Sequence, residues 1–106
     1  MNKFLLAYHG SPKFESKEAG IAHMVAWRAW SQGLGDAVVD PGMPVGMSKT
    51  ITSNGSVVDG GGANPLSGIT VLQADTIEQA IALAKSCPHL SAGGTIEIAQ
   101  AFNMDM

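Results

Sequence analysis

The chain has 106 residues and a formal net charge of −3, with 45% hydrophobic and only 14% charged residues. This length predicts one domain over residues 1–106, because two domains would each be too small to bury a core. The six Lys and Arg residues form no basic stripe, which argues against a nucleic-acid partner. So few charges leave much of the surface without hydrated groups, which favours burial against a partner.

Neither a membrane span nor a metal site is indicated. The apolar run at residues 4–8 is too short for a signal peptide or a spanning helix. The single cysteine, Cys87, can form no internal disulfide, so we expect a cytoplasmic protein. The three histidines are widely spaced, without the short repeats typical of ligands, and we expect no metal and no cofactor.

The first half of the chain predicts a strand, a helix and a second strand. Residues 3–9 are apolar on both faces, as in a central strand that is covered on both sides. Ser16 is a candidate N-cap for a helix that runs to Gln32, where glycines follow. Residues 36–40 predict a short second strand, and residues 43–47, rich in Pro and Gly, predict a loop.

A hairpin is predicted next, from residues 49–52 and 57–58 around Asn54-Gly55. An Asn-Gly pair supplies the positive φ angles that a tight hairpin turn needs. The glycine run at residues 60–62 lacks the spacing and the following helix of a phosphate-binding loop. We therefore interpret it as a flexible connection that can act as a lid over a pocket.

The last part of the chain repeats the strand–helix–strand order. Residues 68–74 predict a second central strand. Asp75 and Glu78 have the spacing of a capping box, and Pro88 is expected to end the helix that they open. Residues 95–101 predict the final strand, so the complete order is β-α-β-hairpin-β-α-β.

This order predicts an α+β fold with a ferredoxin-like antiparallel sheet and two helices on one face. The strands at residues 4–8 and 69–72 nevertheless carry bulky apolar side chains on both faces. Each such side chain contributes roughly 1.5–3 kcal/mol when it is fully buried, so leaving a whole face in water is costly for a small domain. We therefore expect a homodimer in which two sheets pack face to face, a dimeric α+β barrel.

Several segments resemble the YCII-related, or DGPF, family over nearly the whole chain. The family is named for an Asp-Gly-Pro-Phe loop, where this chain has Asp59-Gly60-Gly61-Gly62. The resemblance implies a dimeric α+β barrel with a ferredoxin-like protomer, in agreement with the order of elements. The matching segments are Gly55–Gly62, Asn64–Asp75, Ile77–Ala80, Cys87-Pro88 and Gly93–Ile98.

The resemblance also implies a site. Some YCII relatives have a His–Asp pair proposed as a general acid/base, with the histidine in the first helix, a position that resembles His23. Asp36 and Asp40 both flank the second strand as partners, and Asp40 is preferred because it ends that strand. The other interpretation is that both are turn residues that bond locally. Relatives include dehalogenase- or isomerase-like enzymes acting on muconate-type compounds, and others are encoded beside sigma factors.

The chemistry of individual side chains leaves alternatives open. Imidazole titrates near neutral pH, so His23 can take and return a proton, or it can be a packed helix residue. Trp27 and Trp30 either wall a flat apolar ligand or belong to the core. His9 ends the first strand, where it can contact a ligand carboxylate or be solvated, and His89 is expected on a surface turn.

Three hypotheses about function follow. The first is a cofactor-free enzyme, isomerase-, lyase- or dehalogenase-like, in which His23 and an aspartate transfer a proton on a small, partly unsaturated organic acid. The second is a dimeric module that binds a small molecule without chemistry. The third is a non-catalytic regulatory or interaction protein, linked to sigma-factor systems. Fold alone does not choose among them.

Overall fold

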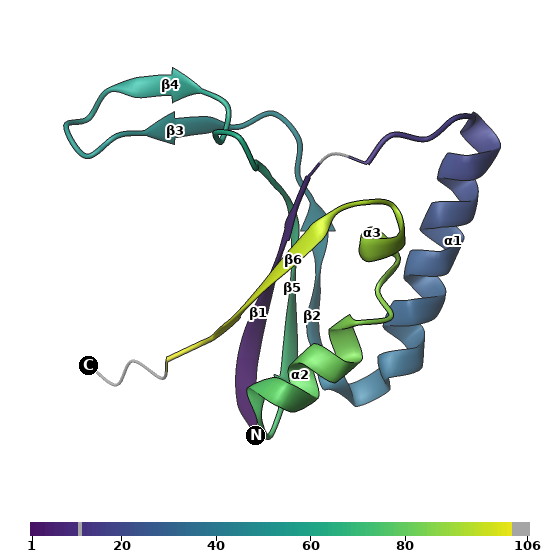
Figure 1. Cartoon of the computed structure of the whole chain (residues 1–106). Coiled ribbons are helices and arrows are strands. Elements are labelled where there is room, and N and C mark those ends of the chain that lie inside the picture. Colours follow the sequence, from purple (N-terminus) through teal and green to yellow (C-terminus); the bar gives the residue numbers. More distant parts are fainter. Residues whose placement is uncertain (11, 103–106) are drawn as a thin grey trace.

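The computed structural model describes residues 1–10 and 12–102. Within these residues three helices, one 3-10 turn and six strands follow one another (Figure 1). The order confirms the predicted β-α-β-hairpin-β-α-β succession and adds the 3-10 turn and a short third helix. The elements are β1 (Asn2–His9), α1 (Lys17–Leu34), η1 (Gly35–Ala37), β2 (Val38–Pro44), β3 (Lys49–Ile51), β4 (Val57–Asp59), β5 (Leu66–Ala74), α2 (Ile77–Ala84), α3 (Pro88–Ser91) and β6 (Thr95–Gln100).

Four strands form an antiparallel sheet in the order β2-β5-β1-β6. The two long central strands, β1 and β5, pair along their whole length, and Leu6 lies opposite both Thr70 and Ile98. All three helices lie on one face of this sheet (Figure 1). The protein is therefore an α+β fold of the ferredoxin-like kind, as the sequence predicts.

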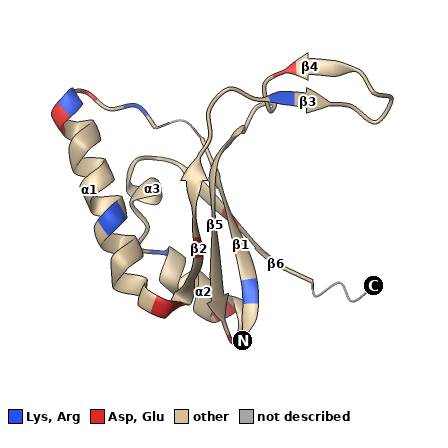
Figure 2. Ribbon diagram, turned by 180° about the vertical axis from the view of Figure 1, so that it is seen from behind, with Lys and Arg blue, Asp and Glu red and all other residues tan. Residues whose placement is uncertain are grey.

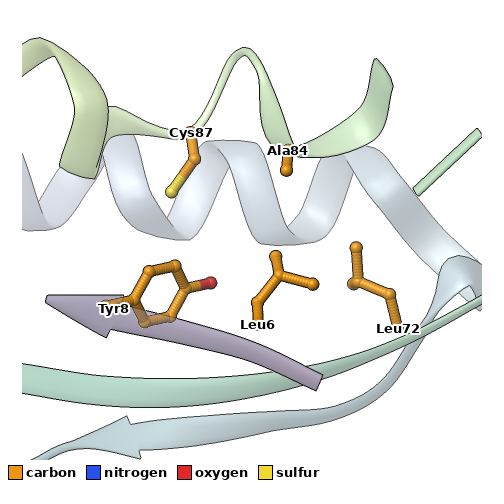
Figure 3. Close-up of a cluster of buried hydrophobic side chains, with 5 residues drawn as sticks. All are labelled: Leu6, Tyr8, Leu72, Ala84 and Cys87. Atoms are coloured by element: carbon orange, nitrogen blue, oxygen red, sulfur yellow. The ribbon is translucent and has the colours of Figure 1, made fainter. Parts of the chain in front are cut away.

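The core lies between the sheet and the helices. Alternate residues of β1, namely Phe4, Leu6 and Tyr8, are buried on this side, as the period of a strand requires. Leu6 and Tyr8 form one cluster with Leu72 of β5 and with Cys87, beyond the end of α2 (Figure 3). The buried residues of α2 are alanines, which allows that helix to lie close to the sheet.

No described element forms a layer over the opposite face of the sheet. Leu5 of β1 is 37% exposed, and it pairs with Val71 of β5 and Ala99 of β6. Because directly paired residues share a face, these three side chains form an apolar strip on the uncovered side. The coloured charges in Figure 2 are few, and most lie near the ends of elements. The prediction of strands that are apolar on both faces is confirmed.

Helix α1 begins and ends where its caps place it. Ser16 is the N-cap, and its hydroxyl oxygen accepts a hydrogen bond from the Ala19 amide at 3.1 Å. The helix ends at Gly35, whose φ of 56° is unfavourable for other residues. It passes the predicted end at Gln32, because Gly33 stays in the helix and does not break it.

The predicted bounds of the second strand are wrong. Residues 36 and 37 belong to η1, and β2 runs from Val38 to Pro44, through part of the predicted loop. Pro41 has no amide hydrogen for a ladder, and the pairing with β5 shifts register on either side of Asp40. Gly42 then takes a φ of 71°, with its backbone packed so closely on Ile69 that a Cβ would lie 1.8 Å from that carbonyl oxygen.

The cap of α2 is shifted by one residue from the box predicted at residues 75–78. Thr76 is the N-cap, and its hydroxyl accepts from the Gln79 amide at 3.2 Å. The Gln79 side chain in turn accepts from the Asp75 amide at 2.9 Å. Pro88 does not end α2 but begins α3, a position where a missing amide hydrogen is not needed.

Strands β3 and β4 form a hairpin that projects from the body of the molecule (Figure 1). The hairpin is confirmed, although its connection is longer than a two-residue turn and only Gly55 has a positive φ, of 90°. Ile51 is 73% exposed and Val57 is 60% exposed, so the arm carries apolar side chains in solvent. No helix of the described residues is long and apolar enough to cross a membrane.

Candidate functional site

A cavity of about 440 Å³ opens between α1 and the ends of β2 and β5. This volume lies within the range of roughly 300–1,000 Å³ that is typical of small-molecule sites. No Lys, Arg, Asp or Glu lines it among the described residues, and the polar side-chain groups of the lining are hydroxyls, imidazoles and the indole of Trp27. The lining residues are Tyr8, Pro12, Phe14, His23, Met24, Trp27, Pro41, Gly42, Met43, Pro44, Ser67, Gly68, Ile69, Thr70 and His89.

Tyr8 and Thr70 form a hydrogen-bonded chain beside this cavity. The Tyr8 hydroxyl donates to the Thr70 hydroxyl oxygen at 2.8 Å, and Thr70 donates to the Pro41 carbonyl oxygen at 3.1 Å. Burial raises the pKa of Tyr8 well above its ordinary value. The phenol therefore stays protonated at neutral pH and holds β1, β5 and the irregular part of β2 together.

His23 faces the cavity from α1. One helical turn further on, Trp27 donates its indole N–H to Nε2 of His23 at 2.8 Å. The His23 ring also lies against Phe14, with ring centroids 4.7 Å apart. Burial lowers the pKa of His23 from its ordinary value of 6.5, and the charge of a protonated His89 is a second, smaller cause in the same direction. His23 is therefore neutral at pH 7 and bonded on one nitrogen.

His89 lines the same cavity from α3. The residue is only 4% exposed, and its Nε2 lies 2.8 Å from the backbone carbonyl oxygen of His9. The ring occupies space left open by Gly94, where a Cβ would lie 2.0 Å from Nε2. Its centroid is 5.4 Å from that of Tyr8. The position of His89 is thus fixed by β1 and by the loop before β6.

Trp27 joins these groups into one aromatic cluster. Its ring meets Tyr8 edge-on at 4.9 Å, and its centroid lies 6.2 Å from that of His23 and 6.5 Å from that of His89. Aromatic edges and faces of this kind pack well against a flat ring. Together with two imidazoles, whose nitrogens can donate and accept hydrogen bonds, the arrangement can hold a small flat molecule and move a proton on it.

The structure does not bring the predicted aspartates to His23. A carboxylate oxygen of Asp40 accepts from the Gly42 amide at 2.8 Å, in a local turn. Asp36 lies in η1, where its backbone oxygen accepts a hydrogen bond from the Gln73 side chain. Asp36 also lines a separate hollow at the far end of β5. Among the described residues, no carboxylate hydrogen-bonds His23, so the proposed His–Asp pair is absent within one subunit.

The two other predicted ligand contacts also lie outside the cavity lining. His9 is held at the end of β1, with Nδ1 2.9 Å from the Asn64 carbonyl oxygen and Nε2 3.3 Å from a Glu97 carboxylate oxygen. Trp30 donates its indole N–H to the Leu83 carbonyl oxygen at 3.1 Å and packs against the core. Of the predicted ligand contacts, Trp27 alone is among the residues that line the cavity.

Sequence reasoning missed Tyr8, Thr70 and His89 as site residues. Tyr8 and Thr70 follow from the strand period, because they share the buried face with the core positions of β1 and β5. His89 had one usable signal: Pro88 before it is typical of the first position of a helix. The described residues also contain no group of three or more His, Cys, Asp or Glu side chains placed to hold a metal ion.

Fold and cavity together define a small ferredoxin-like α+β protein with a pocket between its first helix and its sheet. No protein-family model and no curated protein sequence matches the chain. Among solved structures it is similar to the 5-chloro-2-hydroxyhydroquinone dehydrochlorinase TftG from Burkholderia phenoliruptrix AC1100, in complex with 2,5-dihydroxybenzoquinone. The TM-score is 0.61 at 14% identity, covering 96% of this chain and 95% of that one. This likeness shows a shared fold, and the YCII-related assignment stays a prediction.

Proposed function

We propose that the protein is a cofactor-free enzyme of the dehalogenase-like kind, which transfers protons on a small hydroxylated ring. The observation that carries this proposal is a cavity without formal charges that places two imidazoles, His23 and His89, beside Trp27 and Tyr8. A carboxylate ligand would meet no Lys or Arg among the described lining residues. A phenol or quinol, which is neutral but weakly acidic, suits such a pocket better.

Loss of HCl from a chlorinated trihydroxybenzene needs only proton transfers. One ring hydroxyl loses its proton, and a proton adds to the neighbouring carbon that carries chlorine. A second hydroxyl then loses its proton, and chloride leaves with the electron pair of the broken C–Cl bond. The ring becomes a hydroxyquinone without any external oxidant, so general acids and bases suffice. The name of the structurally similar protein, a dehydrochlorinase of a chlorinated hydroxyhydroquinone, supports this choice of chemistry.

The test is chloride release from 5-chloro-1,2,4-trihydroxybenzene under anaerobic conditions, followed by ion chromatography and by quinone absorbance. We expect turnover by the wild type and a loss of about 100-fold or more in kcat for His23→Gln, in the usual range for a group that transfers a proton or stabilises developing charge. Arg28→Gln is the control, because Arg28 is exposed on α1 outside the cavity lining. Binding of the ring without chloride release would instead support a binding module.

We further propose that two copies pack through the uncovered face of the sheet. The chain exposes 7436 Å² of surface, whereas a compact monomer of its mass exposes roughly 5,600 Å². The excess is about twice the ~800 Å² that each partner contributes to a standard interface. Leu5 and Val71 lie in the middle of that face, and the exposed arm of β3 and β4 adds a second apolar surface. The cavity lining includes Ile69, which pairs with Ala7 on the same face, so a second copy would also border the site.

A further inference from the structure

The two cavity histidines are held in opposite neutral forms. Each neutral imidazole carries one N–H donor and one lone-pair acceptor, and the partner of one nitrogen fixes the role of the other. For His23 the partner is the indole N–H of Trp27, which can only donate. Nε2 of His23 is therefore the acceptor, and its proton is on Nδ1.

For His89 the partner is a backbone carbonyl oxygen, that of His9, which can only accept. Nε2 of His89 therefore carries the proton, and Nδ1 carries a lone pair. Among the described residues no hydrogen bond reaches this Nδ1. If Nδ1 were buried, it would be a buried side-chain nitrogen without a partner, and the described residues contain no such atom. Nδ1 of His89 thus keeps access to open space, and the cavity is the open space that His89 lines.

We propose that His89 and His23 act as a complementary acceptor and donor pair that selects rings with at least two oxygens, and that His89 is the base. Nδ1 of His89 takes the proton of the ring hydroxyl next to the chlorine-bearing carbon, while Nδ1–H of His23 donates a hydrogen bond to a second ring oxygen. The inference deepens the proposed function and rests on it for the identity of the reacting ring.

The proton transfer balances within the site. The O–H bond of the ring breaks, an N–H bond forms on Nδ1 of His89, and the electron pair stays on the ring oxygen as a phenolate. The imidazolium keeps its Nε2–H on the His9 carbonyl, which stabilises the charged form. The same proton then passes from His89 to the ring carbon that carries chlorine, and neutral His89 is restored.

This assignment changes the role that the sequence suggested for His23. With its only lone pair engaged by Trp27, His23 presents a donor to the cavity and stabilises developing charge on oxygen. The residue that presents a free lone pair is His89, which comes from a different helix. Both bear on one ligand because the core places α1 and α3 on the same face of the sheet, as Figure 1 shows.

Nitrogen-15 spectra of the imidazoles test the pair directly and without turnover. We expect His23 with the proton on Nδ1 and His89 with the proton on Nε2 at pH 7.5. The same tautomer in both rings, or the reverse assignment, would overturn the inference even if the wild type releases chloride. Adding 1,2,4-trihydroxybenzene under argon should shift both sets of signals, whereas 1,2,4-trimethoxybenzene, which has no proton to give, should leave His89 unchanged.

Variants separate the base from a merely structural histidine. Glutamine can place its amide N–H near the position of Nε2, so His89→Gln can keep the bond to His9 and the fold while removing the base. We expect at least a 100-fold lower kcat on the chlorinated ring with KM changed by less than about three-fold. Ser91→Ala is the control on the same short helix, because Ser91 bonds only Pro88 in its own turn.

The outcomes distinguish the two proposals. If the wild type releases no chloride but shows the opposite tautomers and the selective shifts, the proposed reaction is wrong and the recognition pair stands. Turnover that survives in His89→Gln within a few-fold of the wild type sinks the inference and leaves the reaction standing. Absence of any shift of His89 with the trihydroxy ring likewise sinks the inference.

Discussion

Gly94 leaves the space in which the imidazole of His89 lies: a Cβ at this glycine would stand 2.0 Å from Nε2 and 2.3 Å from Cε1 of the ring. The ring is confined from the other side by its hydrogen bond to the His9 carbonyl oxygen. The loop before β6 and the end of β1 therefore position the same side chain. A glycine packed against the His89 ring thus controls the geometry of the cavity.

Gly94→Ala should displace the His89 ring and break its bond to His9. Overpacking of this kind costs about 1–3 kcal/mol of unfolding free energy, which urea titration measures. Gly33→Ala is the matched control, because no atom lies within 4 Å of the added Cβ and alanine favours a helix by about 0.5–1 kcal/mol. Equal effects of the two substitutions would contradict the confinement of His89.

Trp27→Phe should raise the pKa of His23. The indole N–H bonds the lone pair of the neutral imidazole, so it favours the uncharged form, and its loss removes that preference. Proton NMR titration of the His23 ring measures the change. Trp30→Phe is the control, because the Trp30 N–H goes to the Leu83 carbonyl oxygen and to no histidine. A pKa of His23 that moves equally in both variants would show that ring volume, not the hydrogen bond, is responsible.

The order of elements could be predicted because it depends on local patterns. Alternation along β1, the serine cap of α1 and the Asn-Gly hairpin each act within a few residues. The predicted bounds were wrong where two neighbouring residues could each have capped a helix or ended a strand. Thr76 displaced Asp75 as the cap of α2, and β2 continued through Pro41 because Asp40 and Gly42 form a turn that lets pairing with β5 resume at Met43.

The site was less predictable because its key contacts are distant in sequence. The hydrogen bond of His89 to the His9 carbonyl joins residues that are 80 positions apart, so no local sequence pattern predicts it. The bond from Trp27 to His23 spans one helical turn, and its spacing was visible, but its chemical consequence depends on which imidazole nitrogen faces the indole. The aspartates were chosen by resemblance. Asp40 bonds the Gly42 amide in a local turn, and Asp36 lies in η1, where its backbone oxygen accepts from Gln73.

Acidification below pH 6.5 should weaken the fold through His23. Its pKa in the folded state is lowered from 6.5, first by burial, so the folded protein binds fewer protons than the unfolded chain. The stabilisation is fully present at pH values above the pKa of His23 in the unfolded chain, and it is lost as the pH falls from that pKa through the lower pKa of the folded state. Urea unfolding between pH 7.5 and 5 should show a smaller decline for His23→Gln than for the wild type. Arg28→Gln should decline as the wild type does.

Cys87 should react slowly with thiol reagents in the folded protein. Burial raises the pKa of its thiol to about 11, and only the thiolate is nucleophilic. Alkylation by iodoacetamide at pH 8 should therefore be far slower in buffer than in denaturing urea, as mass spectrometry can follow. Rapid labelling of the folded protein would show that this part of the core in Figure 3 opens readily.

Leu5→Lys should convert the proposed homodimer into a monomer. Leu5 is 37% exposed on the uncovered face of the sheet, and a lysine there would carry an unpaired charge into the centre of the interface. Leu90→Lys is the control, because Leu90 is almost equally exposed, at 38%, but lies on α3 on the helix side. Sedimentation equilibrium at micromolar concentration should give twice the chain mass for the wild type and Leu90→Lys, and the chain mass for Leu5→Lys. A wild type that sediments as a single chain would remove the second copy from the cavity and leave the apolar strip of β1, β5 and β6 facing solvent.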